Sequence, residues 1–226
     1  MAIAVAGRMG KALEQAVLLD EELDLAGIWR RGNDINKLLI RSDILIDFSL
    51  PEANEVILDA AIKSNTPLVC GVSGFDDQQL ERLVKASNII PIVFDRNMSL
   101  GIAVLERSVR EAAASIGPDF EIEISEIHHV NKKDAPSGTA LKLGEAISTT
   151  IGNKLAKEIK YSSKRYGEVI GDHKVKMQSS TETLIFSHST TTRQVFVDGA
   201  IQASKWIIGK SAGFYCMQDV LFSELK

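Results

Sequence analysis

The residues best suited to chemistry lie in a single segment, Glu126 to Ala140. It holds two of the chain's four histidines, His128 and His129, side by side, and Lys132 and Lys133 follow them. Imidazole and ammonium groups supply the protons and the positive charge that a reaction on an anionic substrate requires. The segment therefore predicts a cation-rich loop that assists proton transfer.

The same segment ends in a helix start. Ser137, Gly138 and Thr139 precede a helical pattern over Leu141–Ile147, and either Asp134 or Ser137 can cap that helix. The first backbone N–H groups of a helix have no partner within it, and the positive end of the helix dipole attracts anions. We therefore expect a carboxylate of the substrate to bind here.

A purely structural interpretation of this segment stays open from the residues alone. One imidazole can be buried and the other exposed, the lysines can form a solvated face, and the Ser-Gly-Thr run can do no more than cap a helix. A metal site is not expected, because adjacent histidines on a strand point to opposite faces and no third ligand stands at a metal-like spacing.

A second candidate site is a short turn between an apolar run, Ala2–Ala6, and a helical pattern over Lys11–Leu19. Its residues are Gly7, Arg8, Met9 and Gly10. Small residues between a buried strand and a helix let the backbone approach a pyrophosphate, which the helix start attracts. The turn indicates either a dinucleotide site or an ordinary tight turn, because Ala4 stands where a full glycine pattern would begin.

Two arginines, Arg30 and Arg31, follow the next expected strand, Leu23–Trp29. In dinucleotide-binding folds this position normally carries an acid that binds the ribose of NAD. Guanidinium groups instead suit a 2′-phosphate, which they bind through paired N–H groups. The pair therefore favours NADPH, with NADH as the alternative cofactor and a solvated surface pair as the structural alternative.

The first ~100 residues alternate apolar runs with helical patterns, which predicts a parallel sheet in a Rossmann-like α/β domain. Further strands are expected at Ile44–Phe48, Leu68–Cys70 and Ile89–Phe94, and helices from Pro51 and over Asp76–Ala86. The helix from Pro51 should bury Val56, Ile57, Ala60 and Ala61. Ligands bind at the carboxyl ends of such strands, so we expect cofactor contacts at Phe48, Gly71, Val72 and Ser73.

The pattern changes beyond a helix expected over Ile102–Ile116. Phe120, Ile122 and Ile124 alternate with polar residues, which is typical of a strand in a mixed or antiparallel sheet. Further strands are expected near His173–Met177 and Thr183–Ser187, and a helical stretch over Ala203–Leu225. We therefore predict a dinucleotide-binding domain from residues 1–98 and 204–226, and an α+β substrate-binding and oligomerisation domain from residues 99–203.

Composition narrows the class of protein. The chain has 226 residues and a net charge of −4, with no basic block, so nucleic acid is not an expected partner. No apolar run approaches the roughly 18 residues that span a bilayer, so no membrane segment is expected. Cys70 and Cys216 show no metal-ligand spacing, which favours buried thiols in a reducing cytoplasm.

Taken together, these motifs resemble the dihydrodipicolinate reductase family. Its signature E-x-H-H-x-x-K-x-D-A-P-S-G-T-A is unbroken from Glu126 to Ala140. The G-R-M-G turn, the I-D-F-S segment, the G-x-x-G-F loop and the N-x-S-x-G segment from Asn97 to Gly101 occur in family order. This chain departs from the family pattern at Ala4, at Ala6, at Arg30 and in the pair Val72-Ser73.

The resemblance implies reduction of a cyclic dicarboxylate by hydride from NAD(P)H, on the route to diaminopimelate and lysine. It implies proton donation by Lys132, with His128 as the second choice. It places the substrate carboxylates at His129, Ser137, Gly138 and Thr139, and adds Asn97 and Met98 to the cofactor site. It also implies a homotetramer.

Two rival functions are kept in view. Another two-domain amino-acid oxidoreductase, such as an aspartate or homoserine dehydrogenase, would share the nucleotide domain but lack the His-His to Ser-Gly-Thr segment. A cofactor-binding regulator without turnover would have no use for His128 and Lys132, which are both present.

Overall fold

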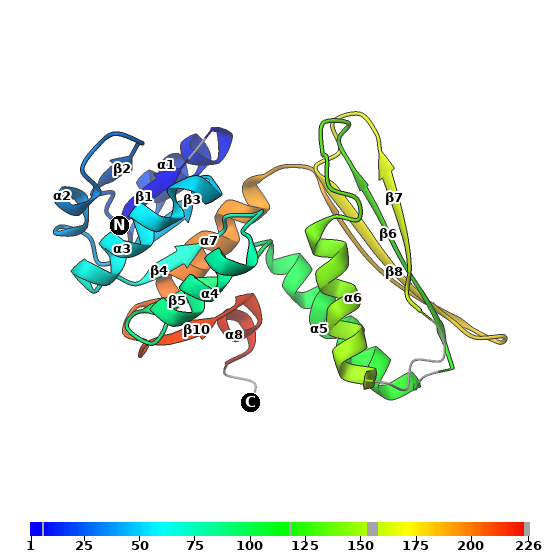
Figure 1. The fold of residues 1–226 in the computed structure, drawn as a ribbon. Coiled ribbons are helices and arrows are strands. Elements are labelled where there is room, and N and C mark those ends of the chain that lie inside the picture. Colours follow the sequence, from blue (N-terminus) through cyan, green and yellow to red (C-terminus); the bar gives the residue numbers. More distant parts are fainter. Residues whose placement is uncertain (6, 118, 153–157, 224–226) are drawn as a thin grey trace. The chain divides into compact units, whose positions relative to one another are not determined.

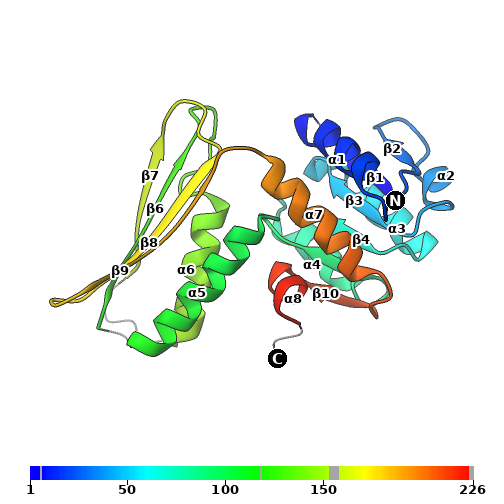
Figure 2. The ribbon, with the colours of Figure 1, turned by 180° about the vertical axis from the view of Figure 1, so that it is seen from behind.

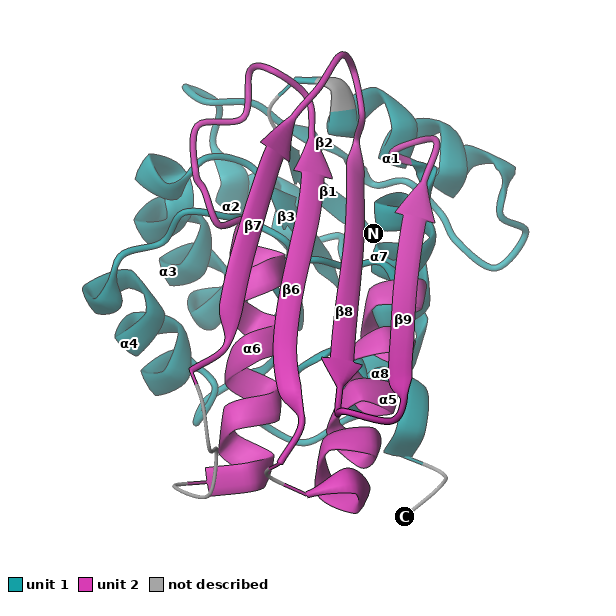
Figure 3. Ribbon diagram, turned by 90° about the vertical axis from the view of Figure 1, so that its right-hand side faces the viewer, with its two compact units in different colours: residues 1–100, 194–226 teal, residues 101–193 magenta. Residues whose placement is uncertain are grey.

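The computed structural model describes residues 1–5, 7–117, 119–152 and 158–223 of the chain. It contains two compact units: residues 1–100 with 194–226, and residues 101–193 (Figure 3). Residues 194–203, which we expected in the second domain, belong to the first unit. The reason is that they form the first turns of helix α7 (Gln194–Ile207), whose apolar face packs on strands of unit 1.

Unit 1 is built on a six-stranded parallel sheet (Figure 1). The strand order is β10-β5-β4-β3-β1-β2. The strands are β1 (Ala2–Val5), β2 (Gly27–Trp29), β3 (Leu45–Phe48), β4 (Leu68–Cys70), β5 (Pro91–Phe94) and β10 (Gly213–Tyr215). The order reverses between β1 and β3, and in open α/β sheets a ligand binds beyond the carboxyl ends at such a point. The expected Rossmann-like sheet is confirmed.

Helices cover both faces of this sheet. One face carries α2 (Ile35–Leu39), the short η1 (Pro51–Ala53), α3 (Asn54–Ser64) and α4 (Asp77–Ala86), and the other carries α1 (Arg8–Leu19), α7 and α8 (Met217–Phe222), as the view from behind shows (Figure 2). Because both faces are covered, the strands are apolar without alternation: Leu45, Ile46, Leu68 and Val69 are all fully buried.

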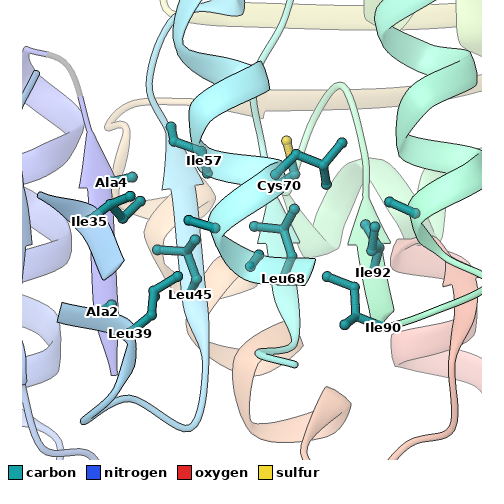
Figure 4. Close-up of a cluster of buried hydrophobic side chains, with 14 of the residues drawn as sticks. Ala2, Ala4, Ile35, Leu39, Leu45, Ile57, Leu68, Cys70, Ile90 and Ile92 are labelled. Atoms are coloured by element: carbon teal, nitrogen blue, oxygen red, sulfur yellow. The ribbon is translucent and has the colours of Figure 1, made fainter. Parts of the chain in front are cut away.

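The core between the sheet and α2, α3 and α4 shows where helix periodicity was misjudged (Figure 4). Ile57, Ala60 and Ala61 of α3 are buried there as expected. Val56, also expected to be buried, is 54% exposed, and Leu58 takes the place in the core. Val56 and Leu58 are two positions apart, about 200° around the helix, so only Leu58 falls in the buried stripe with Ile57 and Ala61.

The C-terminal stretch is not one helix over Ala203–Leu225. After α7 ends, β10 pairs in parallel with β5, and α8 follows. Gly209, at φ +76°, has a backbone conformation that ends a helix readily. A three-residue strand is too short for its periodicity to be recognised, which explains why the sequence pattern missed it.

Unit 2 is a four-stranded mixed sheet with two helices on one face (Figure 3). Its strands are β6 (Glu121–His128), β7 (Lys160–Arg165), β8 (Gly171–Gln178) and β9 (Thr183–Thr190), and its helices are α5 (Leu100–Ile116) and α6 (Gly138–Ile151). β6 pairs in parallel with β7 and antiparallel with β8. Ile122 and Ile124 of β6 are buried against the helices while Glu121 and Glu123 are exposed, so the expected alternation is confirmed.

None of the helices that the structure describes is both long enough and apolar enough to cross a membrane.

Candidate active site

The strand register of unit 2 places the signature residues on one face of the sheet. Glu126 lies opposite Ser163 of β7 and His173 of β8, and His128 lies opposite Arg165 of β7. Alternate residues of a strand share a face, so these side chains point to the same side as Ile122 and Ile124, towards the helices. The sheet therefore gathers a carboxylate, a guanidinium and two imidazoles from three strands.

Glu126 is the centre of this cluster and is only 2% exposed. Its Oε1 accepts hydrogen bonds from Arg165 Nη2 at 2.9 Å and from the Ser137 backbone N–H at 3.2 Å. Its Oε2 faces Arg165 Nη1 at 2.8 Å and His128 Nδ1 in a short contact. Burial opposes ionisation, but the hydrogen bonds from Arg165 and His128 outweigh it and lower the pKa of Glu126 to about 2.

His128 is held with one nitrogen pointing inwards. An ionised carboxylate can only accept hydrogen bonds, so Nδ1 carries the proton in its contact with Glu126. The residue is 7% exposed, and its ring packs edge-to-face on His173 with centroids 5.1 Å apart. Burial lowers the pKa of His128 despite the neighbouring Glu126. The imidazole is therefore neutral at pH 7, with Nε2 as its unprotonated nitrogen.

His173 is a member of the site that the sequence analysis did not assign. Its Nε2 lies 3.2 Å from Ser137 Oγ, and its Nδ1 is buried without a hydrogen-bond partner. Burial, followed by repulsion from the His128 ring when that ring is protonated, lowers the pKa of His173 to about 3. The available signal was that His173 occupies a buried position in the alternating pattern of β8, where an apolar residue is usual. This signal does not reveal that Ser137 is its partner.

The start of helix α6 is built from Ser137. Its Oγ accepts a hydrogen bond from the Ala140 N–H at 3.2 Å, so Ser137 rather than Asp134 is the helix cap. The Ser137 N–H is already bound to Glu126, and the residue is 1% exposed. Its N–H and its hydroxyl group are thus engaged by Glu126, His173 and Ala140. Gly138 and Thr139 are the first helical residues, and the Gly138 N–H donates a hydrogen bond to the Asp134 carboxylate.

Lys132 and Asp134 form an ion pair on the loop that precedes this helix. Lys132 Nζ lies 2.7 Å from Asp134 Oδ1, and the two side chains are 24% and 54% exposed. Burial acts to raise the pKa of Asp134, but the hydrogen bond and charge of Lys132 outweigh it, so the pKa is lowered. The partner is largely solvated, so the ion pair is weak and easily exchanged for a ligand. His129, the other member of the histidine pair, is half-buried.

Arg165 connects the loop of Lys132 and Asp134 to the sheet. The sequence analysis did not assign this residue to the site. Besides binding Glu126, its Nε donates to the Lys132 carbonyl at 3.2 Å, and its Nη2 makes a short contact with the Asp134 carbonyl. The side chain is 19% exposed. The distance of 39 residues between Arg165 and Glu126 explains why no local pattern revealed the pair.

In unit 1, the expected pyrophosphate turn has the geometry of a close backbone approach. Gly7 is the residue before α1 and adopts φ +68°, which favours glycine. A Cβ on Gly10 would come within 2.5 Å of Val5 Cγ2, so glycine allows α1 to pack tightly on β1. No side chain caps α1, and its first turn carries no acid. These features fit a dinucleotide phosphate; Met9 is half-buried beside them, and the Arg8 side chain lies outside the description.

Arg30 and Arg31 lie directly beyond the carboxyl end of β2, and both are exposed. The turn that carries them closes through hydrogen bonds from Asn33 N–H to the Arg30 carbonyl and from Trp29 Nε1 to the Asn33 carbonyl. Gly32, at φ +97°, permits this turn. The two guanidinium groups are thus presented to solvent at the edge of the sheet where a cofactor is expected.

The remaining expected cofactor residues lie at the carboxyl end of β3 or directly after β4 and β5, at the same edge of the sheet. A Cβ on Gly71 would overlap the Phe48 ring, so these two residues lie in contact, and Ser73 is exposed. Val72 and Met98 are 2% and 1% exposed, which leaves mainly their backbone atoms for a ligand. Asn97 Oδ1 accepts from the Ser99 N–H at 2.9 Å. Nearby, burial raises the pKa of Asp47 to about 6.

Two protein-family models match this chain, one over most of unit 1 and the other over unit 2 and part of the C-terminal segment. The family model described as dihydrodipicolinate reductase, N-terminus, matches residues 1–98, and the one described as dihydrodipicolinate reductase, C-terminus, matches residues 101–221.

Similar proteins and a similar solved structure carry names close to those of these models. A 4-hydroxy-tetrahydrodipicolinate reductase from Zymomonas mobilis is 38% identical, covering 97% of this chain and 95% of the relative. One from Caulobacter vibrioides is 40% identical over 97% and 96%. The dipicolinate-bound dihydrodipicolinate reductase of Paenisporosarcina sp. TG-14 has the same fold, with a TM-score of 0.81 at 20% identity over 98% of this chain and 99% of that one. The chain belongs to the dihydrodipicolinate reductase family.

Proposed function

We propose that this chain catalyses the NAD(P)H-dependent reduction of 4-hydroxy-tetrahydrodipicolinate (dihydrodipicolinate) to tetrahydrodipicolinate, in the pathway to diaminopimelate and lysine. The observation that carries this proposal is the unbroken segment from Glu126 to Ala140, folded so that His128, Lys132 and the α6 start are held by shared partners. Membership of the family over both units supports the same reaction.

Each residue of the segment then has a chemical task. The start of helix α6, at Ser137, Gly138 and Thr139, together with His129, is the proposed site for the substrate carboxylate groups. The bound cofactor supplies a hydride. Loss of the 4-hydroxyl group as water gives the conjugated ring of dihydrodipicolinate. Hydride addition to this ring builds negative charge, and Lys132 donates the proton that neutralises it. His128 is the second candidate for proton donation; because its Nε2 is unprotonated in the neutral ring, it must first take up a proton there before it can donate one.

The cofactor assigned to unit 1 is NADPH, with NADH as the alternative. The backbone around Gly7 and Gly10 binds the pyrophosphate, and Phe48, Gly71, Val72, Ser73, Asn97 and Met98 contribute at the neighbouring strand ends. Two exposed guanidinium groups at Arg30 and Arg31 support the choice of NADPH, because the 2′-phosphate is the part of the cofactor that needs a positive partner.

The quaternary structure and location remain predictions. We infer a homotetramer formed through the sheet of unit 2, and a cytoplasmic enzyme. Ile185 of β9 is 54% exposed on that sheet, which is a surface that association would cover. Sedimentation analysis of the purified chain tests the tetramer directly: a single monomeric species at working concentration contradicts it.

The decisive experiment is an NADPH-oxidation assay in which the preceding synthase makes the unstable substrate in situ. We expect NADPH consumption that depends on both enzymes and is inhibited by pyridine-2,6-dicarboxylate, a planar mimic of the substrate. A dehydrogenase for another amino-acid intermediate would not respond to this inhibitor. Binding of NADPH without synthase-dependent oxidation would instead identify a regulator without turnover.

A further inference from the structure

Glu126 takes no part in the chemical steps proposed above, yet its carboxylate meets four nitrogen donors within unit 2. These come from three different parts of the site: the His128 ring, the Ser137 N–H at the start of α6, and both terminal nitrogens of Arg165. A carboxylate has about four acceptor positions, so this one is saturated and has no capacity left for a ligand. Its task is therefore internal to the protein.

Arg165 completes the same arrangement from the neighbouring strand. Its fork binds Glu126 in two parallel hydrogen bonds, a geometry that fixes both planes. Its remaining contacts are to the carbonyl groups of Lys132 and Asp134. One ion pair thus reaches His128, the backbone of Lys132 and the helix that begins at Ser137.

Gly171 explains how the His128 ring fits between its neighbours. A Cβ at this position would lie 3.0 Å from His128 Nε2 and 3.5 Å from His173 Cε1. A Cβ contact of 3.0 Å is tighter than van der Waals packing allows without displacement. The absence of a side chain at Gly171 therefore lets the His128 ring turn its Nδ1 towards Glu126.

We propose that Glu126 and Arg165 are positioning residues, which hold His128 as its Nδ1–H tautomer and couple its orientation to the Lys132 loop and the start of helix α6. The pair touches neither substrate nor cofactor; it acts through these groups. The consequence is that proton exchange at His128 is restricted to Nε2. This inference rests on the proposed function for its catalytic meaning, but the tautomer and the coupling are properties of the free protein.

The first test needs no variant and no turnover. Nitrogen NMR of the imidazole rings in the full-length chain at pH 7 should show His128 protonated at Nδ1 and unprotonated at Nε2. Charged groups that face His128 are Glu126, Arg165 and Lys132, with the His173 ring packed on it. An Nε2–H tautomer overturns the proposal even if the enzyme is fully active.

The second test uses Glu126→Gln, with Glu123→Gln on the exposed face of the same strand as the matched control. We expect a shift of the His128 pKa to lower pH, because Glu126 favours the charged ring. The acid limb of the kcat profile should shift with it, and kcat should fall roughly 10-fold or more, as is usual when an imidazole loses its orienting carboxylate. The KM for NADPH should not change.

Arg165→Lys tests the same positioning role from the other side of the ion pair, and it is used if Glu126→Gln does not fold. Lysine retains the charge but cannot make the paired contact, so kcat should fall while the fold and the KM for NADPH are retained. A His128 tautomer and pKa that stay as in the unmodified chain, in a folded Glu126→Gln or Arg165→Lys protein, overturn the positioning role. An inactive unmodified chain would contradict the proposed function alone, because the tautomer is measured without turnover.

Discussion

The two units each present a helix start that is assigned to an anion, but they build it in opposite ways. At the start of α1, the residue before the helix is Gly7, no side chain caps the helix, and the first turn carries no acid. At the start of α6, Ser137 caps Ala140 with its hydroxyl and gives its own N–H to Glu126. We call the start of α1 the open start, because no side chain caps it, and the start of α6 the fixed start, because Ser137 and Glu126 hold it.

The difference matches the ligand that the proposed function assigns to each helix start. A pyrophosphate is large and carries its own charge, so an open set of N–H groups and a close backbone approach are sufficient to bind it. A small dicarboxylate that must be protonated at one atom requires a fixed orientation relative to the proton donor. The partners of Ser137 supply that rigidity, and the same carboxylate holds His128.

Lys132→Ala should give the largest effect at the fixed start. Loss of a general acid typically costs about 10²-fold in turnover, and Lys132 is the proton donor proposed here. The stability should hardly change, because its partner Asp134 is largely solvated. The measurement is kcat in the coupled assay, with Lys133→Ala as the matched control on the exposed neighbouring residue. A near-normal kcat for Lys132→Ala removes this residue from the role.

Acid should lower the free energy of unfolding, because His173, which lies beside the start of α6, must take up a proton. Its pKa is about 3 in the folded chain against about 6.5 in the unfolded one, so between these values the unfolded chain binds more protons. Stability should therefore fall as pH falls through this window, by an amount on the order of a few kcal/mol. His173→Gln, which keeps a polar group near Ser137 Oγ, should flatten that dependence. Urea unfolding followed by circular dichroism at several pH values provides the measurement; parallel pH profiles for both proteins would contradict it.

The same contrast explains what the sequence could and could not predict. The parallel sheet follows from local alternation, and adjacent residues narrow the cap of α6 to Asp134 or Ser137, of which the structure has Ser137. Arg165 and His173 were not recognised, because their partners lie 39 and 36 residues away and only strand register brings them together. Strand β7 itself, exposed along most of its length, carries no apolar period that would reveal it.

Arg30→Ala should affect the open start and leave the fixed one unchanged. The KM for NADPH should rise roughly 10-fold, the scale of one lost hydrogen bond to a charged group, and the KM for NADH should hardly move. Arg41→Ala removes an exposed arginine elsewhere in unit 1 and is the matched control. The measurement is the KM for NADPH and for NADH, from steady-state kinetics of each protein. A preference for NADH in the unmodified chain, together with an unchanged KM for NADPH in Arg30→Ala, would refute the assignment.

Ser137→Ala is the smallest and most direct test of the contrast between the two helix starts. Losing a serine cap costs about 1 kcal/mol in unfolding free energy, and here it also removes the hydroxyl that faces His173 Nε2. Ser148→Ala, at an exposed position within the same helix, is the control and should be neutral or slightly stabilising, because alanine is the better helix former. Denaturant unfolding of the two variants gives the comparison. Equal stabilities would mean that the hydroxyl of Ser137 does not fix the start of α6, and the two helix starts would then differ only in their backbone geometry.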